Sequence, residues 1–154
     1  MRRIAKGYTC DMSFVYQPNT IKSIRQVNIP TFFEENGHLV VVESKKTFPF
    51  PIKRSFTVFA ENGNIRGQHA HKKCTQLLTC LNGSVRVICN DGENILEFLL
   101  SNPSEGLLIP PEIWSEQIYE LENSILMVTC DRVYESEDYI RDFNEYISFR
   151  ETTS

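Results

Sequence analysis

Two histidines separated by one residue are the clearest chemical feature of the chain. His69 and His71 stand within residues 66–72, Arg-Gly-Gln-His-Ala-His-Lys. Residues two apart in a β-strand point to the same face, with Cα atoms about 6.6 to 7 Å apart, so both imidazoles can address one cavity. Imidazole exchanges protons near neutral pH, which makes the pair a candidate for acid–base catalysis. The alternative interpretation is a pair of structural histidines.

Polar residues around the pair could assist such chemistry. Arg66 and Lys72 flank it and could bind an anionic group, a diphosphate being well suited to a bidentate guanidinium. They could equally be solvated charges at the rim of a site. Gln76 lies on the following segment and could hold one imidazole in a chosen tautomer.

Short β-rich segments separated by turn residues must position these side chains. Asn82-Gly83 and Asn90-Asp91-Gly92 are typical hairpin turns. Many short strands with no long helical pattern between them predict an all-β fold, an antiparallel sandwich or barrel, of which a jelly roll fits best. The expected strands are residues 26–29, 37–43, 55–60, 74–81, 84–89, 94–100, 106–109 and 124–131.

A single domain accounts for the chain, because 154 residues suffice for one sizeable core. We expect an N-terminal extension over residues 1–20, the barrel domain over 21–150 and a tail over 151–154. The segment 136–149 changes character, since its apolar residues recur at spacings of three and four, which predicts a short helical segment closing the barrel. Those residues are Tyr139, Ile140, Phe143, Tyr146 and Ile147.

Composition limits the partners and the compartment. A net charge of -4 argues against a general nucleic-acid binder, which needs a basic surface. Apolar runs such as 39–42 and 125–128 are far shorter than the roughly 20 residues that span a bilayer, and the basic start lacks the apolar core of a signal peptide. We therefore expect no membrane partner and a cytoplasmic location.

The cysteine content also indicates a reducing compartment. The chain has five of them, an odd number without any C-x-x-C pair, which favours reduced thiols over a disulfide framework. Most stand in apolar, strand-like segments, so we expect inert buried thiols rather than nucleophiles or metal ligands.

The spacing around the histidines resembles the first motif of the cupins. His69-x-His71 is followed by Gln76 after four residues and by Gly83 after six more. In metal-binding cupins the two histidines and a glutamate are ligands, joined by a histidine from a second motif. Here Gln76 and Ser115 stand at the glutamate and second-motif positions. An amide and a hydroxyl are poor ligands for a divalent metal, so we expect no metal and no other cofactor.

The chain also resembles a narrower family, the nucleotide-sugar 3,4-ketoisomerases. The likeness runs from about Ile24 to Tyr146. It rests on the string at 66–73, on Gln76, on Cys-x-Asn-Gly-Ser at 80–84 and on Asp-Tyr-Ile-Arg at 138–141. Supporting matches are Phe-x-Ile-Lys-Arg at 50–54, Gly-Leu at 106–107 and Pro-x-x-Trp at 111–114.

This resemblance implies a dimeric, metal-independent jelly-roll enzyme that converts a dTDP-4-keto-6-deoxy-glucose into its 3-keto isomer, on the way to deoxyamino sugars of surface glycans. It implies His69 and His71 as catalytic residues. It implies substrate contacts from Arg54, Arg66, Lys72, Gln76, Trp114 and Ser115.

Three positions depart from the family pattern, and alternatives follow from them. Asn36 stands where family members often have arginine, Phe56 where tyrosine is common and Ser115 where histidine is common. One alternative is a noncatalytic cupin that binds a nucleotide sugar as a sensor or partner subunit. Another is a metal-dependent cupin enzyme, which Gln76 and Ser115 disfavour.

Overall fold

The computed structural model describes residues 20–153 of the chain. The predicted N-terminal extension therefore lies outside the described residues except for Thr20, as does Ser154 at the end of the predicted tail. Among the described residues, no helix is long and apolar enough to cross a bilayer.

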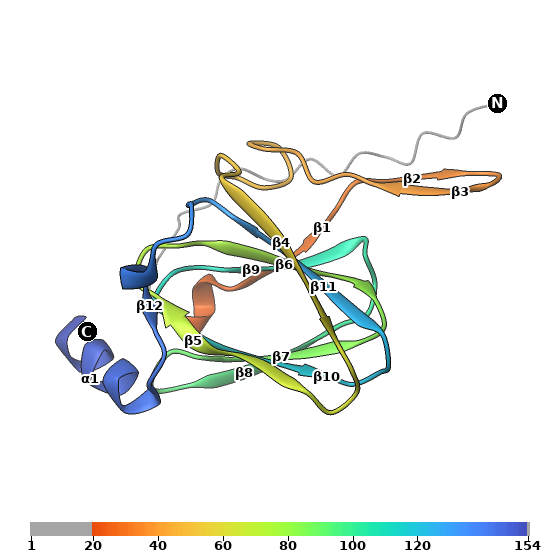
Figure 1. The fold of residues 1–154 in the computed structure, drawn as a ribbon. Coiled ribbons are helices and arrows are strands. Elements are labelled where there is room, and N and C mark those ends of the chain that lie inside the picture. The colour runs from red at the N-terminus through yellow and green to blue at the C-terminus, as the bar shows by residue number, and fades with distance from the viewer. Residues whose placement is uncertain (1–19, 154) are drawn as a thin grey trace.

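Two five-stranded antiparallel sheets face each other and form the barrel (Figure 1). The first sheet has the order β1 (Arg25–Asn28), β9 (Glu105–Ile109), β6 (Gln76–Asn82), β11 (Ser124–Cys130), β4 (Arg54–Ala60). The second has the order β12 (Tyr139–Ile140), β5 (Ile65–His71), β10 (Trp114–Tyr119), β7 (Val85–Asn90), β8 (Ile95–Leu100).

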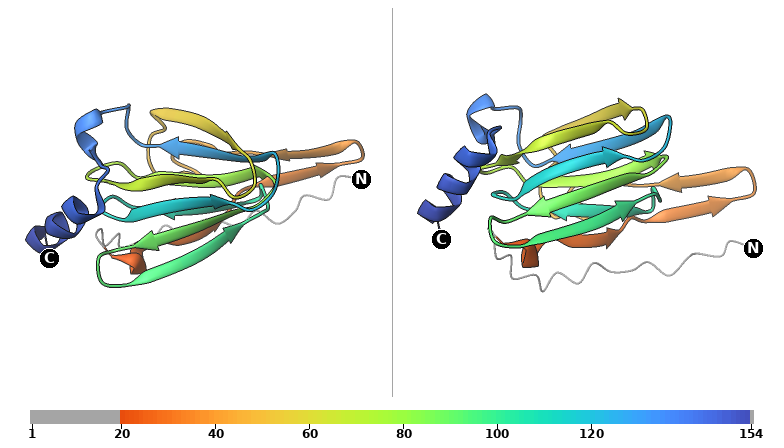
Figure 2. Two further views of the ribbon diagram at one scale, coloured as in Figure 1. Left: turned by 60° about the horizontal axis from the view of Figure 1, so that its bottom comes forward. Right: turned by 90° about the horizontal axis from the view of Figure 1, so that it is seen from below.

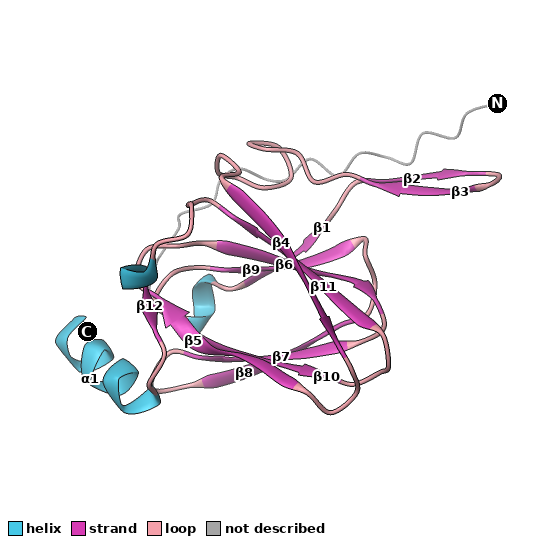
Figure 3. Cartoon of the chain, in the orientation of Figure 1, coloured by secondary structure: helices cyan, strands magenta, loops and turns pink. Residues whose placement is uncertain are grey.

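The remaining elements lie outside the two sheets. Strands β2 (Thr31–Glu34) and β3 (Gly37–Val40) form a separate hairpin. Two 3-10 turns, η1 (Ile21–Ser23) and η2 (Ser136–Asp138), and the helix α1 (Phe143–Thr153) complete the described chain. Figure 3 shows how little of it is helical.

The predicted all-β fold with a C-terminal helical segment is confirmed. Strand β10 was not expected, because three adjacent polar residues, Ser115 to Gln117, hide the alternation in its sequence. The predicted helical stretch was partly wrong. Tyr139 and Ile140 instead form β12, which pairs with His71 and Ala70 of β5, and the helix begins only at Phe143.

Apolar side chains from both sheets meet inside the barrel. Leu78 and Leu126 of the first sheet and Val87 and Leu100 of the second are at most 1% exposed and belong to one cluster. This interior packing supplies most of the favourable free energy of folding. It fills one end of the space between the sheets with carbon and leaves the other end to polar residues.

Helix α1 covers the outer surface of the second sheet beside the histidine strand. Tyr146 packs there with Ala70, Trp114 and Ile140, and all four side chains are buried. The Tyr146 hydroxyl lies 2.7 Å from the carbonyl oxygen of Asn90, which ties the helix to the end of β7. Burial on this outer side fixes the strand whose inner side carries the histidines.

The β2–β3 hairpin projects away from the barrel (Figures 1 and 2). Its apolar side chains Phe32, Phe33 and Leu39 are 53%, 74% and 61% exposed. A two-stranded hairpin gains little stability alone in water. Within the described residues 20–153, the arm therefore presents an exposed apolar surface.

Candidate active site

A β-bulge in β5 gathers the predicted site residues on one face. In the pairing with β10 the register shifts, so that Gln68 is an extra residue between Gly67 and His69. Arg66 lies opposite Gln117 of β10, and residues directly opposite each other in an antiparallel pair share a face. The extra residue shifts the alternation by one. As a result, Arg66 and His69 both line the same pocket, which strict alternation would forbid.

Glycine is required at the bulge for two reasons. The backbone of Gly67 has φ +77°, in the left-handed region that disfavours a side chain. A Cβ at this position would also lie 2.4 Å from Oε1 of Gln117. Moreover, the Gly67 carbonyl lies 2.9 Å from Nδ1 of His69, so the bulge orients the first imidazole as well.

The pocket opens between the two sheets and has a volume of about 340 Å³, which suits a small organic ligand. Its wall is apolar on the side of the first sheet and polar on the side of β5 and β10. The lining residues are Phe56, Val58, Ile65, Arg66, Gly67, Gln68, His69, Gln76, Leu78, Gln117, Leu126, Val128 and Arg141.

The two imidazoles are in direct contact. Nε2 of His69 lies 3.3 Å from Nε2 of His71. His69 lines the pocket, whereas His71 lies behind it and is only 5% exposed. Asp138, from the end of η2, accepts a 2.7 Å hydrogen bond from Nδ1 of His71. The structure thus brings the two predicted catalytic residues together and adds a carboxylate.

These contacts determine where the protons lie. The Gly67 carbonyl requires a proton on Nδ1 of His69, and the Asp138 carboxylate requires one on Nδ1 of His71. The two Nε2 atoms face each other at 3.3 Å and can share a proton. Burial lowers the pKa of His69 to about 4, helped by the charges of His71 and Arg141. The Asp138 carboxylate lies on the His71 side of this contact.

Asp138 is held as an anion. Burial alone would raise the pKa of its carboxyl, but hydrogen bonds from His71 and from the backbone N–H groups of Lys73 and Cys74 lower that pKa below its usual value. The Lys73 N–H donates to Oδ1 over 2.7 Å. The carboxylate thereby fixes both the tautomer of His71 and the turn that follows β5.

Tyr139 packs over both imidazoles. Its ring centroid lies 4.3 Å from that of His71 and 5.0 Å from that of His69. Nη2 of Arg54 donates to the Tyr139 hydroxyl over 3.2 Å. Arg54, predicted as a substrate contact, is therefore placed behind the histidines through Tyr139 and is not among the residues that line the pocket.

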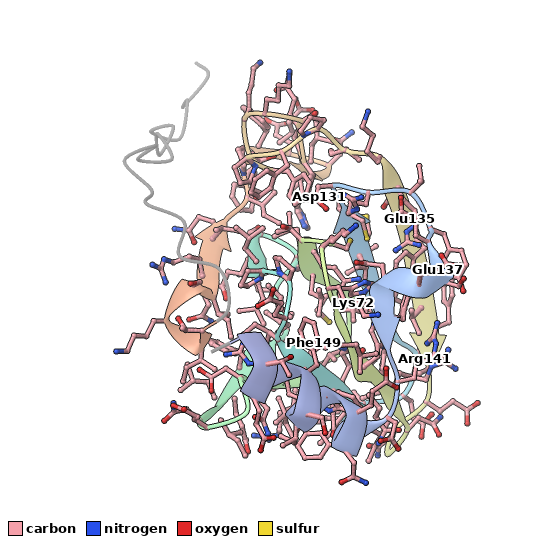
Figure 4. All side chains as sticks on the ribbon, turned by 90° about the vertical axis from the view of Figure 1, so that its left-hand side faces the viewer. Lys72, Asp131, Glu135, Glu137, Arg141 and Phe149 are labelled. Atoms are coloured by element: carbon pink, nitrogen blue, oxygen red, sulfur yellow. The ribbon has the colours of Figure 1, made fainter. Side chains whose placement is uncertain are left out.

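Two guanidinium groups line the pocket. Arg66 occupies the position predicted from the sequence, and Arg141 joins it from the segment after β12, with its guanidinium 4.2 Å from the centroid of the Tyr139 ring. Lys72 is not in the pocket lining. It stands directly after β5, where its backbone N–H donates to the carbonyl oxygen of Asp138 over 2.8 Å, on the side of the molecule that also carries Glu137 (Figure 4). Arg141 thus stands where an anion clamp was expected from Lys72.

The other polar residues predicted for the site have different neighbours from those expected. Gln76 lines the pocket, but its amide donates to Sγ of Cys130 at 3.8 Å and no described hydrogen bond joins it to an imidazole. The predicted tautomer control by Gln76 is therefore carried out by Gly67 and Asp138. Ser115 is buried and accepts a 3.1 Å hydrogen bond from Gln117.

Trp114 faces away from the pocket. Ser115, its neighbour on β10, lies opposite His69 and so points inward, which turns Trp114 outward. There its ring packs against Phe143 and Tyr146 of α1. Trp114 therefore holds α1 against the outer side of the second sheet, behind the strand that carries the histidines.

Sequence reasoning gave no role to Asp138, Tyr139 or Arg141. All three stand in the Asp-Tyr-Ile-Arg string that carries part of the family resemblance. The string indicated that these residues matter, but it did not indicate which residues they contact. Gln117 was missed together with its strand. The alternation of polar residues at 115 and 117 is the only local sign of its inward orientation.

One group of potential metal donors occurs among the described residues. Donor atoms of His71, Cys74 and Asp138 all lie within 4.8 Å of one another. However, Nδ1 of His71 and the Asp138 carboxylate are hydrogen-bonded to each other. The group is thus an internal hydrogen-bonded unit and does not offer an open ligand set.

Comparison with known proteins identifies the family. The sequence profile of the family described as "FdtA: WxcM-like, C-terminal" matches residues 22–151. The TDP-4-oxo-6-deoxy-alpha-D-glucose-3,4-oxoisomerase of Aneurinibacillus thermoaerophilus is 40% identical over 121 residues, which cover 78% of this chain and 87% of that protein.

Solved structures agree with this result. QdtA, a sugar 3,4-ketoisomerase from Thermoanaerobacterium thermosaccharolyticum in complex with TDP, has a TM-score of 0.83 and 32% identity and covers 87% of this chain and 98% of its own. A histidine-to-asparagine mutant of QdtA in complex with TDP-4-keto-6-deoxyglucose has a TM-score of 0.83 and 31% identity over 86% and 97% of the two chains. The chain therefore belongs to the FdtA, WxcM-like C-terminal family of nucleotide-sugar 3,4-ketoisomerases.

Proposed function

We propose that this enzyme moves the keto group of a dTDP-4-keto-6-deoxy-hexose from C4 to C3, using His69 and His71 as acid and base. The observation that carries the proposal is the contact between the two Nε2 atoms, 3.3 Å apart and backed by Asp138. Two Nε2 atoms that share a proton offer one donor and one acceptor. An isomerisation through an enediol needs one of each.

The reaction then follows from this state of the pair. A base removes the C3 proton, the electron pair forms a double bond between C3 and C4, and O4 takes up a proton to give the enediol. In the second half O3 loses its proton, the C3 ketone forms and C4 is protonated. His69 lines the pocket and touches the substrate: its Nε2 takes up the C3 proton and returns a proton to C4, while the proton that O4 gains is the one that O3 loses. His71 lies behind His69 and exchanges protons with the substrate only through it.

The charges of the pocket suit a diphosphate. Arg66 and Arg141 both line it, and guanidinium groups bind phosphate oxygens in bidentate fashion. The same positive charges favour negative charge on an enediolate oxygen. The apolar side of the pocket, with Phe56 at its edge, suits the 6-deoxy end of the sugar better than a hydroxylated one.

We propose that the reaction needs no metal. Gln76 donates to a sulfur and Ser115 accepts from Gln117, so neither side chain is poised as a ligand beside the histidines. A carbonyl adjacent to the reacting C–H bond already acidifies it, and the arginines supply positive charge.

The exposed hairpin supports a homodimer. Phe32, Phe33 and Leu39 offer an apolar surface on an arm that extends from the barrel, and a second copy would bury it in a closed, two-fold contact. Asn36 lies in the turn at the far end of this arm, away from its own pocket. Sedimentation at micromolar concentration should give twice the chain mass, and a monomer would contradict the dimer.

We further place the enzyme in the cytoplasm, in the formation of deoxyamino sugars for surface glycans. The described cysteines 74, 80, 89 and 130 are free thiols, as is usual in a reducing compartment. The 3-keto product has the carbonyl that an amine-transferring enzyme requires at C3.

Turnover decides between this proposal and a noncatalytic protein that only binds a nucleotide sugar. The purified chain is incubated with dTDP-4-keto-6-deoxy-glucose, and the sugar resonances are followed by NMR. We expect the 4-keto signals to be replaced by those of a 3-keto isomer. Saturable binding without any new isomer, at enzyme concentrations comparable to substrate, would support the binding protein instead.

A further inference from the structure

One cysteine does not fit the prediction of inert buried thiols. Burial raises the pKa of Cys80 and, to about 12, that of Cys89, as expected for apolar surroundings. Cys130 is equally inaccessible, with 0% exposure, but two N–H donors, one of them a guanidinium, converge on its sulfur. This arrangement is typical of an anion rather than of a packed thiol.

The two donors come from the strands on either side of Cys130. On β11, Cys130 lies opposite Arg54 of β4 on one side and opposite Gln76 of β6 on the other, so the three side chains share the inner face of the sheet. Nη2 of Arg54 lies 3.5 Å from Sγ, and Nε2 of Gln76 lies 3.8 Å from it. The thiol of Cys74, just before β6, donates to the carbonyl oxygen of Thr75 over 3.5 Å.

Arg54 in turn needs an anion. Its guanidinium is always charged, and among the described residues no carboxylate forms an ion pair with it. Its side-chain acceptors in this part of the chain are the Cys130 sulfur and the Tyr139 hydroxyl, at 3.5 Å and 3.2 Å. Phe56 and Tyr134 pack against its other faces.

We propose that Cys130 is a positioning residue for the isomerisation: as a buried thiolate it is the counter-ion of Arg54, and through Arg54 it holds Tyr139 against the two histidines. Tyr139 touches both imidazoles. Loss of the negative charge would free Arg54 and loosen the ring that packs on the catalytic pair. The kinetic part of this proposal rests on the isomerase function proposed above, whereas the ion pair does not.

The electrostatic surroundings of the sulfur support the thiolate. Interaction with the neighbouring Cys74 thiol, followed by the hydrogen bond and charge of Arg54, lowers the pKa of Cys130 to about 6 in spite of burial. The pKa of Cys74 is raised by its interaction with Cys130, by burial and by the charges of Cys130, Asp131 and Asp138.

The ion pair is tested by titration of the thiolate absorbance near about 240 nm, between about pH 5 and pH 8. The full chain carries Cys10→Ser, which removes the one cysteine outside the described residues. We expect a step centred near pH 6 that persists in C10S/C80A and is absent in C10S/C130S. In C10S/R54Q its midpoint should rise by about one pH unit or more, because the counter-charge is lost.

No step in C10S, or a midpoint unmoved by Arg54→Gln, overturns the ion pair. Neither measurement requires Cys130 to be replaced, so the test survives if C130S does not fold. The titration does not measure turnover. A failure of the proposed function therefore cannot be mistaken for a failure of the ion pair.

Kinetics test the positioning role. In C130S we expect kcat to fall about 10-fold with KM within about 2-fold of the parent, because misplaced catalytic groups affect the transition state and not the binding of the ground state. The matched control C80A removes a buried thiol that does not contact Arg54 and should retain the parent kcat. A folded C130S with the parent kcat would overturn the positioning role even if the titration step is present.

Discussion

Asp138 accepts a 2.7 Å hydrogen bond from Nδ1 of His71, across 67 positions of sequence. The carboxylate and the imidazole are each only 5% exposed. In this setting the carboxylate fixes the tautomer of the ring. The relationship makes two adjacent histidines unequal, because only His71 has a carboxylate beside it.

Replacing Asp138 by asparagine should separate these effects from simple packing. The amide oxygen of Asn can still accept from Lys73, but its NH₂ group would face Nδ1 of His71 and favour the opposite tautomer. We expect kcat to fall by about 10²-fold or more with little change in KM, measured by steady-state kinetics on the folded variant. The matched control is D131N, because Asp131 accepts a similar backbone hydrogen bond from Thr75 without touching a histidine. Equal losses in both variants would assign Asp138 to loop structure alone.

The bulge predicts that replacing Gly67 by alanine destabilises the protein more than replacing Gly63 does. Gly67 and Gly63 both have positive φ, +77° and +83°, but only at Gly67 would a Cβ meet another residue. Gly63→Ala should cost about 1–2 kcal/mol from backbone strain. Gly67→Ala should cost about 1 kcal/mol more, because the added Cβ would displace the end of the Gln117 side chain and break its hydrogen bond to Ser115, and should also lower kcat by moving His69. Chemical denaturation of both variants measures the difference, and equal stabilities would contradict the packing at the bulge.

Lowering the pH should destabilise the protein through His69. The pKa of His69 is lowered to about 4, so between about pH 6.5 and pH 4 the unfolded chain binds a proton there that the folded chain does not. The stabilisation is present above pH 6.5 and is lost as the pH falls, by up to about 3 kcal/mol. Denaturant unfolding at pH 7.5 and pH 4.5 should show a smaller loss in His69→Asn than in the parent. Asp138, whose pKa is also lowered, adds little to the loss in this range, because its carboxyl is ionised in both the folded and the unfolded chain down to about pH 4.5.

Removal of metal should have no effect. Prolonged treatment with a chelator, followed by gel filtration into metal-free buffer, should leave kcat and the unfolding midpoint unchanged, because neither Gln76 nor Ser115 supplies a strong ligand beside the histidines. Elemental analysis showing one tightly bound transition metal per chain, or activity restored only by added metal, would contradict this expectation.

The sequence predicts which residues form this site better than it predicts which residues they contact. The doublet His69 and His71 and the turn residues suffice to predict a strand with both imidazoles on one face of an all-β barrel. The inward direction of Arg66 cannot be predicted, because it depends on a bulge that changes the alternation after Gln68. The outward direction of Trp114 depends on the register of β10, a strand that its polar sequence conceals.

Contacts between residues far apart in the sequence could not be predicted either. Asp138 and Arg54 are placed by chain elements far from the histidines, and neither spacing nor composition indicates that they meet at His71 and Tyr139. The ionisation of Cys130 is similar, since it arises only when β4, β6 and β11 align three side chains in one row. Such effects belong to tertiary packing, which local patterns do not encode.

The most direct test of the account is proton transfer by the histidines themselves. The parent enzyme and the variants His69→Asn, His71→Asn and the double variant are incubated with dTDP-4-keto-6-deoxy-glucose in heavy water, and NMR follows deuterium at C3 and C4 of the sugar. Exchange should fall by about 10²-fold or more in each variant, most in His69→Asn, while nucleotide-sugar binding changes little. Equal rates of exchange at C3 in the parent and the double variant would contradict the account and leave both histidines with a structural role.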